Sequence, residues 1–185
     1  MSKVVIAGDA SGTGTFTISA PNGNTDRTLV LPDEAGTIIT TAGVPASAMP
    51  AGSVLQVVSA GTTASTATSS TTYVPTSITA TITPTSSSNK VYIVFSGSFC
   101  TTAANTEVQV TVYRNGTNLS ATSLANLYTA THSGYLCVSL PFQYLDSPAT
   151  TSATTYTVYM KEAGVAGTVT TTGEVKTITL MEIAA

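Results

Sequence analysis

The side chains suited to acid–base or nucleophilic chemistry are few and widely spaced. His132 is the only histidine, and it lies in the run from Thr129 to Gly134, whose small polar residues are typical of a loop. General acid–base catalysis needs a group that titrates near neutral pH and a partner that orients it. Because no such partner stands at a recognisable spacing, we interpret His132 as a surface or turn residue and predict neither a catalytic nor a metal-binding residue.

Paired carboxylates are the other arrangement worth testing, because glycoside hydrolysis needs two of them about 5 to 10 Å apart. The adjacent pair Asp33 and Glu34 lies in a turn, which favours solvated turn residues. The remaining candidates are Asp146, Glu162 and Glu174, and the chain has no tryptophan to serve as a sugar platform. We therefore predict that the chain is not an enzyme and needs no cofactor.

Two cysteines, Cys100 and Cys137, lie 37 positions apart and match no metal or redox spacing. The first residues lack the apolar run of a secretion signal. Disulfides form mainly in oxidising compartments. The sequence therefore favours two free thiols in or beside strands, with a disulfide as the alternative, and a protein that folds and assembles in a cytoplasm.

The composition indicates a β-structured protein. The 185 residues include 38 Thr and 21 Ser, and only 8% are charged, compared with about 25% in ordinary soluble domains. Threonine is β-branched and suits the half-buried surface of a sheet. The net charge is −3 and no basic cluster is present, so we expect no nucleic-acid binding. No apolar run approaches the roughly 18 residues of a membrane span, so we expect no membrane partner.

Residues 1–40 carry three short strand patterns, Thr15–Ile18, Thr28–Leu31 and Thr37–Thr40, separated by turn residues. A segment this short is at the lower limit of about 40 residues for a domain that has no disulfide or bound metal to stabilise it. We therefore predict an N-terminal β-arm at 1–40 whose apolar side chains are covered by other chains, and a linker at 41–52. The predicted assembly residues are Phe16, Ile18, Leu29, Leu31, Ile38 and Ile39.

Residues 53–185 show strand patterns at the spacing of sandwiches and jelly rolls. The clearest alternation places Val108, Val110 and Val112 on one face, before the hairpin signal Arg114–Thr117. We predict an all-β fold in which the arm precedes an eight-stranded β-sandwich or jelly-roll-like domain at 53–185. Its expected strands include Val54–Val58, Ile78–Thr83, Val91–Phe95, one long strand through Leu136, Val138, Leu140 and Phe142, one through Tyr156, Val158 and Met160, and Lys176–Ile183. At most one helical turn is expected, within Ala121–Ala130.

Two stretches resemble known virion proteins. Gly14 to Ile18 and Asn24 to Thr37 (GTFTI, then NTDRTLVLPDEAGT) are similar to segments of tail-fibre and other virion proteins of tailed bacteriophages. Tyr144 to Pro148, Ser152 to Tyr156 and the ending Ile178 to Ile183 resemble the C-terminal β-sandwich of the same group. The resemblance covers most of the chain, although its motifs are low in complexity.

This resemblance implies a homotrimeric virion protein without catalytic residues. A short arm followed by one sandwich suits a capsid decoration (cement) protein better than a tail fibre, which usually carries a long shaft. The expected partners are two further copies and the major capsid protein or other virion subunits, and the expected location is the exterior of the particle. The alternative is a short tail fibre or receptor-binding knob whose loops at Thr62–Thr72 and Ala121–Ser133 bind host surface glycans. The eight tyrosines favour sheet packing over a sugar-binding face.

Overall fold

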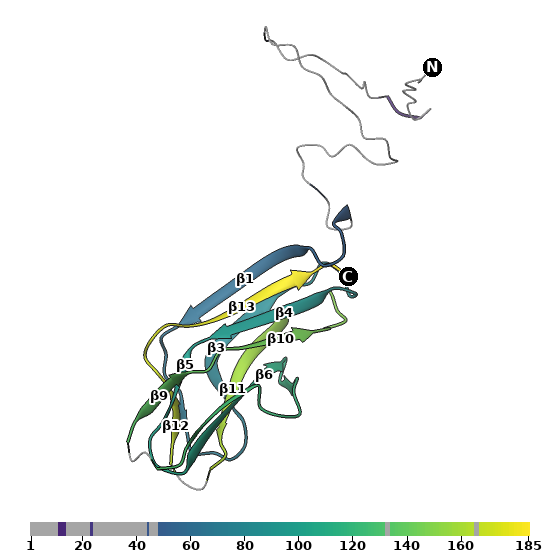
Figure 1. Ribbon diagram of the computed structural model, residues 1–185. Coiled ribbons are helices and arrows are strands. Elements are labelled where there is room, and N and C mark those ends of the chain that lie inside the picture. The colour runs from purple at the N-terminus through teal and green to yellow at the C-terminus, as the bar shows by residue number, and fades with distance from the viewer. Residues whose placement is uncertain (1–10, 14–22, 24–43, 45–47, 132–133, 165–166) are drawn as a thin grey trace. The chain divides into compact units, whose positions relative to one another are not determined.

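The computed structural model describes residues 11–13, 23, 44, 48–131, 134–164 and 167–185 (Figure 1). The chain divides into two units, residues 1–38 and 39–185. All but four residues of the predicted arm and half of the predicted linker lie outside the described residues, so both remain predictions.

The second unit is an all-β, sandwich-like domain, as predicted, and no α-helix occurs among its described residues. It contains thirteen strands, where the sequence predicted eight. They are β1 (Val54–Thr62), β2 (Ala67–Thr68), β3 (Val74–Ile82), β4 (Lys90–Ser96), β5 (Ser98–Thr101), β6 (Thr106–Arg114), β7 (Thr117–Asn118), β8 (Ala125–Thr129), β9 (Leu136–Ser139), β10 (Phe142–Asp146), β11 (Thr154–Glu162), β12 (Val169–Thr171) and β13 (Lys176–Ile183).

Interruptions within five longer strands explain the higher count. Only Gly97 separates β4 from β5, and only two residues separate β9 from β10. The ladder continues across this break, because the amide of Leu140 donates to the carbonyl oxygen of Gly97 at 3.0 Å. In the same way, β7 and β8 pair with one edge of β6. Joining β1 with β2, β4 with β5, β7 with β8, β9 with β10 and β12 with β13 gives eight long strands.

The order of the strands is that of a jelly roll. The first sheet runs β1-β13-β4-β10 and continues in the same order as β2-β12-β5-β9, and the second runs β3-β11-β6 with β7 and β8 at its edge. When the eight long strands are numbered along the chain, the two sheets read 1-8-3-6 and 2-7-4-5. Two antiparallel sheets of four strands connected in this way form the double Greek key of a jelly roll. The fold prediction is confirmed at this level.

The core lies between the two sheets. The alternation in β6 is confirmed, because Val108, Val110 and Val112 are all buried, and the predicted inward face of β11 is confirmed too. The buried apolar residues packed in one cluster are Ile78, Ala80, Ile82, Val91, Ile93, Phe95, Phe99, Val108, Val110, Val112, Leu140, Phe142, Tyr156, Val158, Met160, Val169, Ile178 and Leu180.

The predicted hairpin at Arg114–Thr117 is confirmed as the connection from β6 to β7. Asn115 and Gly116 both have positive φ, 47° and 84°. A type I′ turn requires positive φ at both central residues, and Asn-Gly is the pair that adopts it most readily.

One local prediction is wrong. The strand expected through Leu136 and Phe142 breaks before Pro141, which has no amide hydrogen for the ladder, and Val138 is exposed rather than inward. The segment Ala121–Ala130, in which at most one helical turn was expected, contains β8, which pairs with β6. In the predicted strand Val91–Phe95, the side chains of Tyr92 and Val94 lie half-buried on the outer face.

The two cysteines form a disulfide, which corrects the prediction of free thiols. Cys100 lies on β5 and Cys137 on β9, and the two residues stand directly opposite each other in the antiparallel pair. Their Cα atoms are 4.0 Å apart. The spacing of 37 residues matched no known motif, because the pairing follows from a strand register that the sequence does not display.

We predict that Cys100→Ser lowers the free energy of unfolding by about 3 to 4 kcal/mol, because a cross-link over 37 residues restricts the unfolded chain by about that amount. Urea unfolding of the oxidised protein with and without a reductant measures this difference. The double variant Cys100→Ser/Cys137→Ser is the matched control, and reductant should not change its transition. An equal transition in oxidised wild type and double variant would contradict the prediction.

Candidate assembly surface

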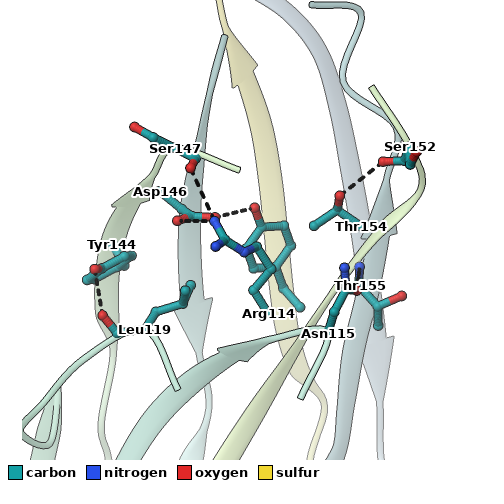
Figure 2. Close-up of polar contacts among 10 residues, drawn as sticks. Arg114, Asn115, Leu119, Tyr144, Asp146, Ser147, Ser152, Thr154 and Thr155 are labelled. Atoms are coloured by element: carbon teal, nitrogen blue, oxygen red, sulfur yellow. Dashed lines mark hydrogen bonds and ion pairs between the residues drawn. The ribbon is translucent and has the colours of Figure 1, made fainter. Parts of the chain in front are cut away.

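Charged side chains at the margin of the core are held by hydrogen bonds to neighbouring residues and connect separate parts of the fold. We call each such group an anchor. Arg114 of β6 donates through Nη1 to both carboxylate oxygens of Asp146 of β10, at 2.9 and 2.8 Å (Figure 2). The hydroxyl of Tyr156 on β11 donates to the same carboxylate at 2.7 Å. Burial raises the pKa of Tyr156, and the hydrogen bond to Asp146 raises it further, so the phenol stays protonated. This cluster joins the two sheets.

Glu182 of β13 is a second anchor, and its side chain is fully buried. Its carboxylate accepts hydrogen bonds from Gln56 Nε2 at 2.5 Å, from the amide and hydroxyl of Thr85 at 2.6 and 2.8 Å, and from Asn89 Nδ2 at 2.7 Å. Burial alone would raise the pKa of Glu182, but the hydrogen bonds from these three residues hold it below its ordinary value. The carboxylate thereby fastens the β3–β4 connection to the end of the first sheet.

Lys176, also fully buried, is the third anchor. Its ammonium donates to the carbonyl oxygen of Glu174 at 2.9 Å and to that of Thr172. Burial lowers the pKa of Lys176, while the nearby Glu174 opposes that shift. Its side chain occupies the bend between β4 and β5, where a Cβ on Gly97 would come within 2.7 Å of Lys176 Cγ. The glycine is therefore required by this packing.

The carboxylates considered for glycoside hydrolysis are not brought together. Glu162 is buried and accepts hydrogen bonds from the amides of Gly164 and Glu107. It lies six residues beyond Tyr156 on β11, roughly 20 Å along the strand from the tyrosine that binds Asp146. Glu174 is exposed in the β12–β13 connection. Asp33, Glu34 and His132 lie outside the described residues.

Within the described ranges, no group of three His, Cys, Asp or Glu side chains is placed to hold a metal ion. The same part of the chain contains no helix that is long and apolar enough to cross a bilayer.

A row of apolar side chains, exposed at its two ends and half-buried in the middle, crosses the outer face of the first sheet, and we call it the apolar row. Val57 of β1 stands opposite Met181 of β13, Met181 opposite Tyr92 of β4, and Tyr92 opposite Leu145 of β10. Val57 is 58% exposed and Leu145 50% exposed. Each of the four strands thus contributes one side chain at the same level, which is why the row is continuous.

The surroundings of the apolar row are uncharged apart from one lysine. On one side, the next row of outward residues across the four strands is Ser59, Thr179, Val94 and Gln143. On the other side, Ile183 stands between Val54 and Lys90. The hydroxyls of Ser59 and Thr179 lie 3.0 Å apart, and the hydroxyl of Tyr92 donates to Gln143. An apolar centre with a polar, already hydrogen-bonded rim is the usual anatomy of a protein–protein contact.

The edge strand β1 extends this surface. It is nine residues long, VLQVVSAGT, and contains neither a charge nor a proline. Natural proteins usually protect exposed edge strands with charges, prolines or short length. The edge strand β3 carries Pro75 and β10 carries Asp146, so β1 is the least protected of these edges.

The assembly residues predicted from the sequence, Phe16, Ile18, Leu29, Leu31, Ile38 and Ile39, lie outside the described residues and remain untested. The apolar row was not predicted from the sequence. A signal was present in β13, where Met181 and Ile183 alternate with Leu180 and Glu182. An outward face containing Met and Ile rather than only Thr and Ser indicates a covered surface, but the matching residues of β1, β4 and β10 could be aligned only once the registers were known.

Comparisons with known proteins give no family. No family model and no curated protein matches the chain. Among solved structures, it is similar to chains of infectious bursal disease virus strains Gx and Gt, each at 14% identity, with TM-scores of 0.42 and 0.43. These matches cover 70% and 72% of this chain and 37% and 39% of those chains.

A third similar structure is a mutant VP2 protein of infectious bursal disease virus in derived T=1 particles, at 13% identity and a TM-score of 0.42. It covers 72% of this chain and 37% of that chain. The chain therefore spans less than half the length of the structures it matches. Similarities of this size assign the chain neither a family nor a function.

We predict that Val57→Lys and Leu145→Lys each change the free energy of unfolding by less than about 0.5 kcal/mol, as exposed substitutions usually do. Ile93→Ala, on the inner face of the same sheet, should cost about 2 to 5 kcal/mol. Urea unfolding monitored by circular dichroism compares the three variants. A loss at Val57 as large as that at Ile93 would show that the row serves folding rather than contact.

We also predict that acid removes the stabilisation due to Glu182. Because its pKa is lower in the folded state than the ordinary 4.5, the unfolded chain binds the extra proton first, so the stabilisation is complete above about pH 4.5 and declines as pH falls through the folded pKa. The difference in unfolding free energy between wild type and Glu182→Gln should therefore shrink in acid. Glu174→Gln controls for the loss of one negative charge, and a pH-independent difference for Glu182→Gln would contradict the prediction.

Proposed function

We propose that the chain is a non-enzymatic structural component of a tailed-phage virion, and specifically a homotrimeric capsid decoration protein that stabilises the shell. The observation that carries this proposal is the apolar row beside an unprotected edge strand on a domain that already has a complete core. The sequence resemblance to phage virion proteins is the reason for proposing a phage particle. The apolar row is the surface that we propose for assembly.

The mechanism is burial of apolar surface. Each Å² of apolar area removed from water stabilises a contact by about 25 cal/mol. Contacts that also bury ions lose much of this gain to desolvation. The outer face of the first sheet has one lysine and no carboxylate among the residues paired across it, so contact there would desolvate few charges. The arm would add the side chains of residues 14–40 to the same assembly.

The disulfide supports an exterior position. Disulfides persist in oxidising surroundings, including the surfaces of virions, and are rare in a reducing cytosol. A subunit assembled in the host cytoplasm would hold Cys100 and Cys137 as thiols. After release of the particle, dissolved oxygen would accept the two electrons and two protons that the thiols lose as the disulfide forms. The register that places them opposite each other requires no rearrangement for this step.

Labelled antibody raised against the sandwich and imaged on intact particles tests the location. Label distributed over the shell is expected, and label confined to the tail tip would overturn decoration in favour of the tail-fibre alternative. Light scattering of the purified chain tests the trimer, for which three copies of the 18.7 kDa chain give about 56 kDa. A species that remains at the monomer mass at all concentrations would refute the homotrimer.

The alternative is adsorption to host glycans through residues 62–72 and 121–133, and it assumes that both segments are loops. Both segments contain strands, β2 in the first and β8 in the second. A different part of the domain, on the second sheet, has the chemistry for such ligands.

We predict that Leu29→Asp abolishes attachment to the particle while the sandwich remains folded, because a carboxylate in a dry contact must be desolvated without a partner. Quantitative binding of the purified variant to particles stripped of the protein measures attachment, and urea unfolding measures the fold. Leu29→Met keeps the apolar character and is the matched control. Normal attachment of Leu29→Asp would show that the arm is not the anchor.

A further inference from the structure

Three tyrosines gather on the outer face of the second sheet, and we call them the tyrosine cluster. They are Tyr73, which precedes β3, Tyr113 of β6 and Tyr159 of β11. The rings of Tyr113 and Tyr159 stack with centroids 3.7 Å apart and an interplanar angle of 16°. The ring of Tyr73 meets Tyr113 edge-on at 6.2 Å. All three side chains are half-buried, so part of each ring remains open to solvent.

The phenol groups of the tyrosine cluster are available for a ligand. Among the described residues, none hydrogen-bonds to the hydroxyl of Tyr73, Tyr113 or Tyr159, whereas the hydroxyls of Tyr92, Tyr144 and Tyr156 each have a protein partner. Partial burial raises the pKa of Tyr73, with further contributions from Tyr113 and Glu107. The phenol of Tyr73 is therefore a neutral hydrogen-bond donor and acceptor over the whole physiological range.

Polar side chains in fixed positions flank the cluster. The carboxylate of Glu107 accepts hydrogen bonds from Gln109 Nε2 at 2.9 Å and from Asn126 Nδ2 at 3.0 Å. Across the sheet, Gln109 stands opposite both Asn126 of β8 and Lys161 of β11. The ammonium of Lys161 lies 4.8 Å from the centroid of the Tyr73 ring. Aromatic surface and amide, carboxylate and ammonium groups thus lie on one sheet face within three neighbouring strands.

From this arrangement we infer that the outer face of the second sheet binds a glycan through the tyrosine cluster. A pyranose ring presents C–H groups on its faces and hydroxyls around its rim. Tyrosine offers an apolar ring and a polar end to such a ligand. Gln109, Asn126, Glu107 and Lys161 supply hydrogen-bond donors and acceptors for the rim hydroxyls.

Two other ligand classes fit this face less well. A protein contact would be expected to have aliphatic residues around the aromatic rings, but the outward residues of the neighbouring strands are Thr79, Thr81, Thr155 and Thr157, with Gln109 beside them. A nucleic acid would require a cluster of basic groups, and Lys161 is accompanied by the carboxylate of Glu107. Aromatic rings among hydroxyl and amide groups match a sugar.

This inference does not depend on the proposed decoration role, because the tyrosine cluster and the apolar row lie on the outer faces of different sheets. A subunit can be held on a particle by the first sheet while the second remains open to the medium. The two proposals can therefore fail separately.

The test uses the full-length protein and an array of neutral, N-acetylated and acidic oligosaccharides, followed by titration of each ligand that is retained. Because the chain has no tryptophan, its intrinsic fluorescence comes from its eight tyrosines, and comparison with the variants identifies the part that comes from the cluster. We expect at least one oligosaccharide to change this emission, and Tyr113→Ala and Tyr159→Ala each to weaken binding on the order of tenfold. Tyr113→Phe should retain most of the affinity.

The exposed Tyr135→Ala is the matched control outside the cluster and should bind like wild type. Urea unfolding establishes that each variant is folded, and Gln109→Ala tests the polar flank without altering a ring. Failure of every oligosaccharide on the array to bind, or wild-type affinity in both folded tyrosine-to-alanine variants, would overturn the inference. Attachment of Tyr113→Ala to particles should be normal, so a loss of glycan binding is distinguishable from a loss of assembly.

Discussion

The structure depends on the insertion of the last strand between the first and the third of the eight long strands. β13 pairs with β1 on one side and with β4 on the other, so Leu180 stands between Val58 and Ile93. Until β13 is in place, β1 has no neighbour in its sheet, and the inner face lacks Ile178 and Leu180. Such contacts join distant parts of the chain, and folds dominated by them fold slowly because the entropy of loop closure is lost before the contacts form. The sandwich is therefore complete only when the whole of residues 54–183 has folded.

The same strand explains where the charges lie. β13 carries Lys176 and Glu182 inward at its two ends, and both are satisfied by fixed partners rather than by water. Asp146 and Arg114 form an ion pair that connects the two sheets, so each charge again has a fixed partner. Each of these ions would be costly to bury alone. By confining them to the margins of the core, the fold leaves Met181 and Ile183 on an outer face with a single lysine, which is what makes that face suitable for contact.

Local patterns were sufficient for the fold class, but not for the details that depend on distant pairing. Val108 to Val112 and Lys176 to Ile183 alternate strictly, because each strand has one face in the core and one outside, and both were located from the sequence. The need for glycine at position 97 could not be predicted, since a Cβ there would approach the side chains of Phe95 and of Lys176, which is 79 positions away in the chain. The disulfide was missed for the same reason, because Cys100 and Cys137 meet only through the register of β5 and β9. The apolar row likewise requires four registers, and the anchors at Asp146 and Glu182 require side chains from separate strands.

The outer faces of the two sheets differ in chemistry although both are built largely from threonine and other uncharged residues. On the first, most of the residues that replace threonine are aliphatic, as with Val57, Met181 and Leu145, although Tyr92 and Gln143 depart from this. On the second they are aromatic or carry amides, as with Tyr113, Tyr159 and Gln109. Packing of the core cannot account for this difference, because all these side chains point away from it. The chemistry of the first face suits the dry protein contact proposed for it, and the chemistry of the second suits the hydroxyl-rich ligand proposed there, so each proposal rests on its own set of side chains.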